Sequence, residues 1–411
     1  MRVAYVTMQF PAPTETFACS DVEALRGLGV EVHVFTLRPP HARHEELVQE
    51  RDLTGVPIKA LTAWRALVGL GRGIRRPLAT AGLVWWLVTS TWRQPSHLLK
   101  SLILLPVSLT IAREVETGGF DVVHLFWGHY PAIVGRLIMR QPTRPVVSVF
   151  LGAYDLLLGY APSRDMASRA DLVFTHSRAN LGDIVALGVR PDRIRVVYRG
   201  LPTALVTRLE TGDELSRAPR RVLSVARLIP EKRMEKVLEV FASVVPRWPD
   251  ASLVVLGEGP ERRALERMAR TLGIQHQVVF RGHVPRDEVV SEMRRSSALL
   301  MLSTKESERL PNVVKEAMAA GCVPVVARTP GIEELVLEGI SGFIVEPDRL
   351  AEAGSHMERI FHGEGIDALR AAGLAHVRAR FDAAVSMQAY REAWASVVDG
   401  YALRLPVGWS E

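Results

Sequence analysis

The feature that most constrains the fold of this chain is a regular alternation of short apolar runs with longer amphipathic segments. In the first half, runs of strand character lie at 3–8, 32–37, 121–125, 146–150, 172–175 and 194–198, with helical patterns at 21–28 and 177–187. In the second half they lie at 221–225, 251–256, 278–281, 298–302 and 323–327, again with helical patterns between them. Because strands that alternate with helices form parallel sheets covered on both faces, the sequence predicts an α/β protein with doubly wound, Rossmann-like sheets.

The length of the chain indicates more than one domain. Its 411 residues exceed what one hydrophobic core usually holds. A polar stretch at 207–220 interrupts the strand and helix series, and we place a linker there. We therefore predict a first domain at 1–206, with an insertion at about 60–113, and a second domain at 207–382. The last helical stretch, 383–411, is predicted to cross back to the first domain.

Charge and cysteine content exclude several classes of protein. The formal net charge is +6, but the chain has no zinc-finger spacing and no run of five or more Lys or Arg residues, so we expect no nucleic-acid partner. Cys19 and Cys322 lie far apart and suggest no disulfide framework, which indicates a reducing compartment. Residues 1–7 have the pattern of a buried strand rather than of a secretory signal. We therefore expect a cytoplasmic protein.

The insertion differs in charge from the rest of the chain. It has two apolar runs, 78–92 and 98–112, which fall short of the ~18 unbroken apolar residues of a membrane span. Tryptophans such as Trp85 and Trp86 on a short apolar helix flanked by arginines are typical of a helix that lies on an anionic membrane surface. The alternative is a pair of ordinary helices packed on a sheet. No Asp or Glu occurs from 53 to 113, whereas the basic residues there are Lys59, Arg65, Arg72, Arg75, Arg76, Arg93, Lys100 and Arg113.

A segment at 304–321 carries the clearest functional pattern. Glu308 precedes Pro311, which favours the first turn of a helix, and Gly321 favours the C-terminal cap of that helix. Glu316 then lies about one turn inside the helix. The unpaired N–H groups of a helix start bind anions, and carboxylates accept hydrogen bonds from hydroxyl groups. Together they fit a nucleotide-sugar, whereas the alternative is a surface helix with a solvated glutamate.

Four segments in the second half resemble, in order, the motifs of family 4 retaining glycosyltransferases of bacterial polysaccharide or glycolipid type. The segments are 225–232, 256–260, 303–321 and 339–347. The resemblance implies the GT-B architecture, in which two doubly wound, Rossmann-like domains face each other across a cleft. It assigns the acceptor to the first domain and the nucleotide-sugar donor to the second. The first half is similar to the family more loosely.

The resemblance implies roles for individual residues. Arg227 and Lys232 match the pair that neutralises the leaving diphosphate, for which a planar guanidinium and a compact ammonium group are suited. Glu308 would bind hydroxyls of the donor sugar, and Glu316 those of the ribose. The predicted catalytic residues are therefore Arg227, Lys232 and Glu308.

The remaining donor contacts are predicted around the same motifs. Glycine turns would bring the backbone close to the ligand, and the end of the strand at 278–281 would contact the base. The base stays open between a UDP- and a GDP-linked donor. No cofactor and no metal are expected, because the metal-binding Asp-x-Asp motif is missing from the sequence. The predicted donor-binding residues besides Glu316 are Gly257, Gly259, Arg281, Gly282, Arg309, Leu310, Pro311, Asn312 and Val313.

Two positions depart from the family pattern. Arg309 stands where the family usually has glycine, and it would either crowd the donor sugar or add a cation for an acidic sugar. Leu151 stands where the family often has a histidine that contacts the donor sugar. His129 or Asp155, which follow neighbouring strands, are the candidates to replace it. Glu15 is placed at the acceptor side of the cleft.

The predicted function is transfer of a sugar, with retention, from a nucleotide-sugar to an acceptor hydroxyl at the cytoplasmic membrane face. The acceptor is expected to be lipid-linked or a polysaccharide, and the protein to be peripheral at the inner membrane. Two alternatives stay open. One is a nucleotide-sugar epimerase or hydrolase on the same fold, and the other is a catalytically inactive binding or scaffold protein.

Overall fold

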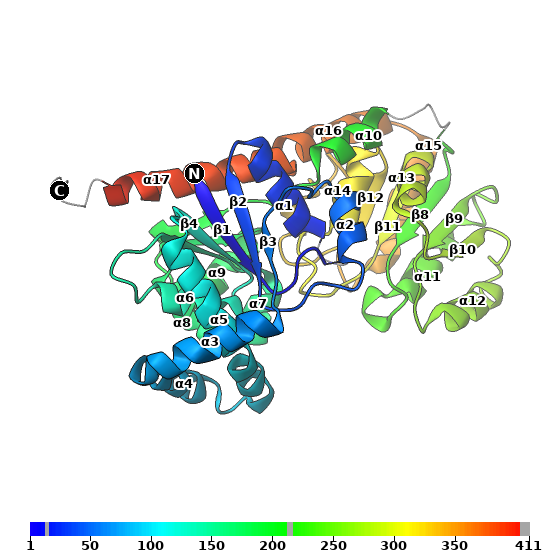
Figure 1. Ribbon diagram of the computed structural model, residues 1–411. Coiled ribbons are helices and arrows are strands. Elements are labelled where there is room, and N and C mark those ends of the chain that lie inside the picture. Colours follow the sequence, from blue (N-terminus) through cyan, green and yellow to red (C-terminus); the bar gives the residue numbers. More distant parts are fainter. Residues whose placement is uncertain (13–15, 212–216, 403–411) are drawn as a thin grey trace. The chain divides into compact units, whose positions relative to one another are not determined.

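The computed structural model describes residues 1–12, 16–211 and 217–402. The chain divides into two compact units (Figure 1). The first unit comprises residues 1–200 together with the C-terminal segment from Ala383, and the second unit comprises residues 201–382. Each unit has its own parallel sheet with helices on both faces, which confirms the predicted α/β class.

The first unit is built on a sheet of seven parallel strands in the order β3-β2-β1-β4-β5-β6-β7. The side chains of β1 alternate between two cores. Val3 and Tyr5 belong to one hydrophobic cluster and Ala4 and Val6 to another, because successive residues of a strand point to opposite faces. The strands are β1 (Arg2–Thr7), β2 (Glu31–Thr36), β3 (Ile58–Lys59), β4 (Val122–Phe126), β5 (Val146–Phe150), β6 (Leu172–Thr175) and β7 (Ile194–Val196).

Helices of the first unit cover both faces of this sheet. One face packs against α1 and the C-terminal α17, and the other against α5, α6 and α8. Most strand boundaries lie within one residue of those expected from the sequence, but β3, α2, α3, α6, α7 and α8 were not predicted. The helices are α1 (Thr16–Gly27), α2 (His44–Glu50), α3 (Ala63–Arg75), α4 (Pro77–Thr91), α5 (Pro95–Thr117), α6 (Pro131–Ile138), α7 (Ala153–Leu158), α8 (Ala161–Arg169), α9 (Leu181–Ala186) and α17 (Ala383–Ala402).

The C-terminal helix α17 is anchored in the first unit. Met387, Tyr390 and Trp394 are buried on the sheet, and the Trp394 indole N–H donates a 2.9 Å hydrogen bond to Ser148 Oγ in β5. The ring of Tyr390 stacks on Phe174 of β6 with centroids 3.8 Å apart. Burial of these large aromatic side chains provides the free energy that holds the helix on the unit.

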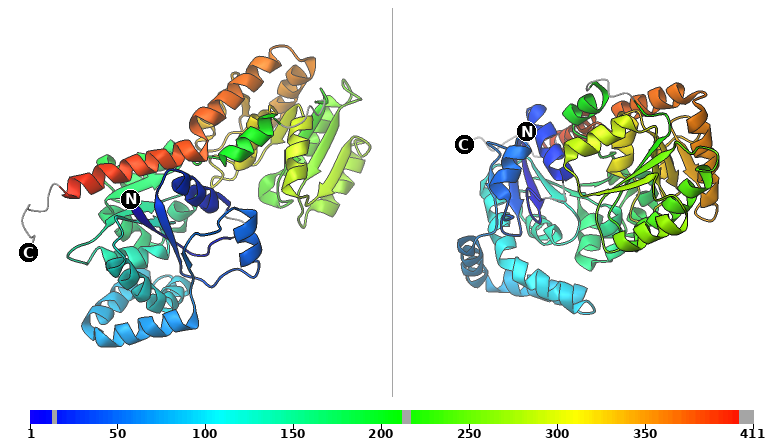
Figure 2. Two further views of the ribbon diagram at one scale, coloured as in Figure 1. Left: turned by 45° about the horizontal axis from the view of Figure 1, so that its top comes forward. Right: turned by 90° about the vertical axis from the view of Figure 1, so that its right-hand side faces the viewer.

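The insertion forms α3, α4 and most of α5. Only α5 lies on the sheet, where Leu104, Val107 and Ile111 enter the core. The helices α3 and α4 pack on the outer side of α5 (Figures 1 and 2). The alternative of two ordinary helices packed on the sheet, at 78–92 and 98–112, therefore holds for α5 but not for α4. Among the described residues, no helix is both long and apolar enough to cross a membrane.

The second unit is built on a sheet of six parallel strands in the order β10-β9-β8-β11-β12-β13. The strands are β8 (Arg221–Val225), β9 (Ser252–Leu256), β10 (Val278–Gly282), β11 (Ala298–Met301), β12 (Val323–Ala327) and β13 (Phe343–Val345). The helices are α10 (Thr203–Thr211), α11 (Met234–Val244), α12 (Arg262–Thr271), α13 (Arg286–Arg295), α14 (Asn312–Ala319), α15 (Ala353–His362) and α16 (Ile366–Arg380). Short 3₁₀ turns connect several of them, including η3 (Pro230–Lys232).

The linker predicted at 207–220 is wrong over its first residues. The helix α10 runs through Thr211 and packs against α14 in the second unit. Its side chains Leu205, Val206 and Leu209 are buried, and because the first two precede the polar stretch, the apolar face that anchors the helix begins before that stretch. The division between the units accordingly falls after Gly200 rather than after Val206.

Candidate active site

The predicted donor residues meet at the centre of the second sheet. The strand β8 has β9 on one side and β11 on the other, so the chain order reverses there. Ligands of open α/β sheets bind beyond the carboxyl ends of the strands at such a switch point. The loop after β8 carries Arg227 and Lys232, and the loop after β11 carries Glu308.

Lys232 and Glu308 form an ion pair between Lys232 Nζ and Glu308 Oε1. Both side chains are mostly buried, and Glu308 Oε2 is enclosed with no hydrogen-bond partner. Burial, followed by the cations Lys305 and Arg227, lowers the pKa of Lys232 to about 8, while Glu231 acts in the opposite direction. The pair thus holds one ammonium donor and one unsatisfied carboxylate oxygen at the same place.

Glu316 lies one turn into α14, at the fifth of its eight residues, and is also ion-paired. Arg286 Nη2, from the first residue of α13, donates a 3.0 Å hydrogen bond to Glu316 Oε1. Burial raises the pKa of Glu316, and the cations Arg286 and Lys315 oppose that rise. Arg286 was not singled out from the sequence, although the proline before it, Pro285, is typical of a helix start.

The helix α14 is present as predicted, but it begins after Pro311 rather than with Pro311 in its first turn. Pro311 is the residue before the helix, and Asn312 and Val313 occupy its first two positions, where backbone N–H groups have no partner inside the helix. Asn312 Oδ1 accepts a 3.1 Å hydrogen bond from Lys315 Nζ. Leu310 is buried beside them. The unpaired N–H groups and the helix dipole favour an anion at this point.

Gly257 and Gly259 fix the loop that carries Arg227. Gly257 has φ +131°, and a Cβ there would lie 1.8 Å from the Ala226 carbonyl oxygen. A Cβ on Gly259 would lie 2.2 Å from the Leu228 carbonyl oxygen. The loop after β9 therefore packs against the backbone on both sides of Arg227, which only glycine permits. The guanidinium of Arg227 itself is exposed.

The structure gives Arg281 two carboxylate partners and buries Arg309, and neither feature was visible in the sequence. Arg281 bonds to Glu292 at 3.0 Å and to Glu288 at 2.5 Å, so its side chain is held within the unit. The carbonyl of Gly282 accepts a 2.8 Å hydrogen bond from the backbone N–H of Gly257. Arg309 is only 7% exposed.

In the first unit, His129 and Asp155 lie together after β4 and β5. His129 Nδ1 is 3.1 Å from Asp155 Oδ1, and the carboxylate also accepts hydrogen bonds from the backbone N–H groups of Gly128 and Gly152, each at 3.0 Å. The Asp155 side chain is fully buried, whereas that of His129 is 14% exposed. A direct ligand contact by Asp155 is therefore excluded in this arrangement. In the neutral imidazole, donation from Nδ1 to the Asp155 carboxylate leaves Nε2 as the hydrogen-bond acceptor.

The loop that carries His129 is strained. Trp127 has φ +76°, which is rare for a bulky residue, and its indole N–H is enclosed with no acceptor. Leu151, at the position where the family has histidine, lies in the hydrophobic core. Strained backbone of this kind is concentrated at functional sites, which favours the His129 loop as part of one.

Glu15 lies outside the described residues. Within the described ranges, no three His, Cys, Asp or Glu side chains lie together as they would in a metal site.

Comparison with known proteins decides the family. The family model described as Glycosyl transferases group 1 matches residues 213–372, and that described as Glycosyltransferase Family 4 matches residues 14–205. The chain belongs to the family 4 glycosyltransferases. The first match contains the Lys232–Glu308 pair and Glu316, and the second contains His129 and Asp155. The recognition made from the sequence motifs is thereby confirmed.

Curated relatives agree with this family, and solved structures agree with the fold. The glycosyltransferase is 25% identical over 373 residues to the putative colanic acid biosynthesis glycosyltransferase WcaL of Salmonella typhimurium, covering 86% of this chain and 88% of that relative. It is 34% identical over 191 residues to a GDP-mannose-dependent phosphatidylinositol monomannoside mannosyltransferase of Mycolicibacterium smegmatis, covering 41% of this chain and 50% of the relative. The structure of Anabaena Alr3699/HepE in complex with UDP has a TM-score of 0.68 at 18% identity, with 96% of this chain and 100% of that chain covered. This likeness shows the fold, which is GT-B.

Proposed function

We propose that this glycosyltransferase moves a sugar, with retention of configuration, from a nucleotide-sugar to a hydroxyl of a lipid-linked or polysaccharide acceptor at the cytoplasmic membrane face. The second unit binds the donor and the first unit binds the acceptor. The observation that supports this best is the Lys232–Glu308 pair at the switch point, with Glu308 Oε2 unsatisfied. A diphosphate would take Lys232 as its counter-charge, and a sugar hydroxyl would donate to Glu308.

The proposed chemistry needs no nucleophile from the protein. The bond between the sugar carbon and the phosphate oxygen breaks, and the acceptor oxygen forms a new bond to that carbon on the same face. The proton of the acceptor hydroxyl passes to the departing phosphate. Arg227, Lys232 and the α14 N–H groups stabilise the charge that develops on the diphosphate. Glu316 is proposed to bind the ribose, and each glutamate would exchange its present cation partner for ligand hydroxyls.

Two observations support an acceptor at a membrane. The relative from Mycolicibacterium smegmatis bears a name that specifies a phosphatidylinositol monomannoside acceptor. In the first unit, α3 exposes a row of large apolar side chains, among them Trp64 at 72% and Ile74 at 78%. An amphipathic helix with this face open and arginines beside it is suited to the surface of an anionic membrane. The UDP of the Anabaena structure and the GDP-mannose of the relative leave the base of the donor open.

A panel of nucleotide-sugars tests the donor site. We expect one class to raise the Tm of the wild-type protein, because a ligand at a hundredfold excess over Kd stabilises the folded state by about 2.7 kcal/mol. Glu316→Gln should weaken binding of that ligand about tenfold or more, because hydrogen bonds to charged groups contribute about 1.5–3 kcal/mol. The matched control is Glu333→Gln, an exposed carboxylate of the same unit. No binding by any nucleotide-sugar would contradict the proposal.

Product analysis with the same ligand separates the alternatives. A transferase consumes donor only with an acceptor. Consumption without an acceptor would identify an epimerase or hydrolase, and tight binding without turnover against any acceptor would identify an inactive scaffold.

The pH dependence of the reaction should report Lys232. Its lowered pKa means that the ammonium group is charged below about pH 8 and loses its charge as the pH rises through that value. Because kcat/KM reports groups of the free enzyme, kcat/KM for the donor should fall above about pH 8. In Lys232→Arg the cation stays charged, so this alkaline decline should move to higher pH. An unchanged decline in Lys232→Arg would assign it to another group.

A further inference from the structure

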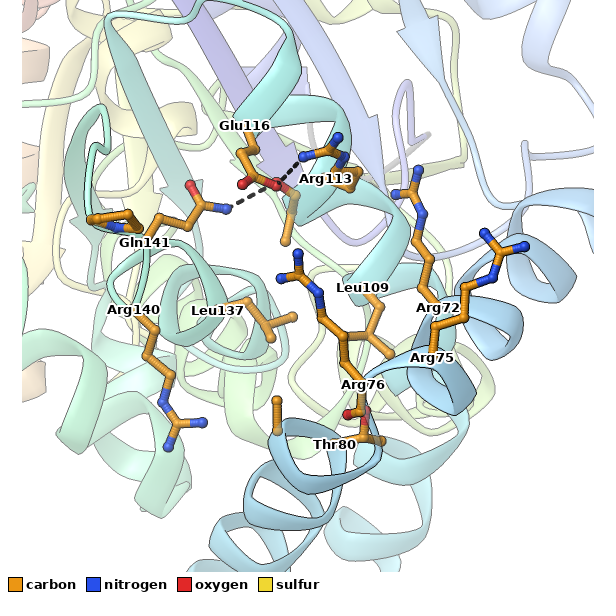
Figure 3. Close-up of a pocket in the computed structure, with 13 residues that line it drawn as sticks. Arg72, Arg75, Arg76, Thr80, Leu109, Arg113, Glu116, Leu137, Arg140 and Gln141 are labelled. Carbon is orange, nitrogen blue, oxygen red and sulfur yellow. Dashed lines mark hydrogen bonds and ion pairs between the residues drawn. The ribbon is translucent and has the colours of Figure 1, made fainter.

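A pocket rich in arginines lies at the junction of α3, α4, α5 and α6 in the first unit (Figure 3). Its volume is about 440 Å³. Arg72 and Arg75 come from the last turn of α3, Arg76 from the α3–α4 turn, Arg113 from α5 and Arg140 from the segment after α6. Figure 3 shows the Arg76 side chain between Leu109 and Leu137, with Arg113 and Glu116 above it. Arginines far apart in the sequence thus line the same pocket, although in Figure 3 their guanidinium groups spread outward around Arg76 rather than meeting at one point.

The positive charge of the pocket is largely uncompensated. Glu116 is the acidic residue of the lining, and its carboxylate is taken by Arg113 at 2.8 Å. Within the described ranges, the guanidinium groups of Arg72, Arg75, Arg76 and Arg140 form no ion pair with a carboxylate. Like charges in proximity repel each other, so their collection in one pocket costs free energy unless an anion offsets it.

Arg72 carries the strongest sign of a missing partner. Its Nη1 is enclosed by the protein and has no hydrogen-bond acceptor. A charged donor that is buried without an acceptor is destabilising by more than an ordinary lost hydrogen bond. A change of the Arg72 side-chain rotamer toward the pocket that it lines would let an oxygen of a bound anion satisfy this group.

The backbone around these arginines is held in place rather than adaptable. One turn before Arg72, Gly69 packs so closely on α5 that a Cβ would lie 1.8 Å from the Pro106 carbonyl oxygen. At the α3–α4 turn, Thr80 Oγ1 donates to the carbonyl oxygens of Gly73 and Arg76, both at 3.0 Å. The helix contact and the turn therefore fix where Arg72 and Arg76 begin, as a preformed site requires.

The surroundings of the pocket are apolar on the outside. Ile74 and Leu78, which flank Arg75 and Arg76 in the chain, are 78% and 89% exposed. They continue the exposed face of α3 that includes Trp64, Leu67 and Leu70. A soluble anion would not need such a face, whereas an anionic lipid presents a phosphate and acyl chains together.

We propose that this arginine pocket binds the phosphate of an anionic phospholipid headgroup while the exposed face of α3 and the start of α4 enters the membrane interface. Arg72 and Arg76 bind the phosphate oxygens, since a guanidinium group matches phosphate with parallel hydrogen bonds. The choice of a lipid as the source of the phosphate rests on the proposed membrane function, but the pocket is separate from the donor residues of the second unit. The proposed lipid site thus lies in the first unit, whereas the proposed donor site lies in the second.

The first arm of the test uses glycerol phosphate as a soluble headgroup probe on the full chain, with saturating nucleotide present to occupy the diphosphate site. Wild-type protein should bind the probe, and Arg72→Gln should weaken binding about tenfold or more, as expected for loss of hydrogen bonds to a charged group. Arg72→Lys should be intermediate because it keeps the charge but not the planar fork. The matched control is Arg93→Gln, which removes one exposed charge of the same insertion outside the pocket and should change little.

The second arm uses vesicles of phosphatidylcholine with and without phosphatidylglycerol. Wild-type protein should sediment with the anionic vesicles and less so as salt increases. Glycerol phosphate should compete with the vesicles for the protein. The double variant Arg72→Gln with Arg76→Gln should weaken vesicle binding much more than the double variant Arg93→Gln with Lys100→Gln, although both remove two positive charges. Equal losses in the two double variants would overturn the pocket in favour of general surface charge. Binding of the soluble probe without vesicle binding would overturn the lipid as its source.

Nucleotide binding, measured on the same samples, separates the two proposals. If the arginine variants bind nucleotide like wild-type protein and the lipid arms fail, the pocket proposal is wrong and the donor site stands. If the wild-type protein binds no nucleotide, the proposed function is wrong whatever the vesicles show.

Discussion

Replacing Lys232 by alanine is expected to lower kcat for sugar transfer by about 10²–10³-fold. A preorganised cation at the point where charge develops in the transition state contributes an effect of this size, as the loss of one such donor shows in other enzymes. In this chain the ammonium group is mostly buried and lies against Glu308, so no solvent cation can replace it at the same place. The measurement is steady-state turnover with the donor identified by the nucleotide-sugar panel.

Lys305→Ala is the matched control for Lys232→Ala. Lys305 is an exposed cation of the loop that carries Glu308, and its loss should change kcat only slightly. Lys232→Arg should retain part of the activity because it keeps a charge at the diphosphate. If Lys232→Ala and Lys305→Ala turn over donor equally well, Lys232 has no role in the departure of the nucleotide.

His129→Ala is expected to lower kcat about a hundredfold while donor affinity stays within a few-fold of wild type. A side chain that positions the acceptor contributes on this scale, because a reactant displaced by about 1 Å can react about 10²-fold more slowly. The Nδ1 contact with the buried Asp155 leaves Nε2 to accept a hydrogen bond from an acceptor hydroxyl. We therefore expect His129→Ala to lower the rate of sugar transfer to the acceptor, whereas the rise in Tm on donor binding should stay as in the wild type.

His129→Asn separates chemistry from positioning. An asparagine amide can still donate to Asp155 and hold the loop, but it offers no imidazole Nε2. We expect kcat of His129→Asn to be as low as that of His129→Ala, with unfolding closer to wild type. Near-wild-type turnover in both variants would remove His129 from the site, and full activity in His129→Asn alone would reduce its role to holding the loop.

The sequence was sufficient to predict both sheets and most of the donor motif. The alternation of apolar and amphipathic runs is a local property, and it predicts parallel sheets without reference to distant residues. The helix at Asn312–Ala319 was predictable for the same reason, because Pro311 and Gly321 favour its two ends by their own backbone geometry. The order of the motifs identified the family, and the family models confirmed it.

What the sequence did not show are contacts between segments that the sheet order brings together. The alternatives of His129 or Asp155 turned out to be one pair, since β4 and β5 are neighbours and Asp155 is buried beneath the loop. The glycines at 257 and 259 were expected to approach a ligand, yet what they pack against is the backbone around Arg227.

The same distinction applies to charge. The sequence by itself determined that the insertion is basic and free of acidic residues, because composition does not depend on the fold. Only the tertiary structure decided that Arg72, Arg113 and Arg140 line one pocket and that Lys232 is paired with Glu308. Electrostatic interactions depend on distance and burial, and both are fixed only when α3 packs on α5 and when β8 pairs with β11.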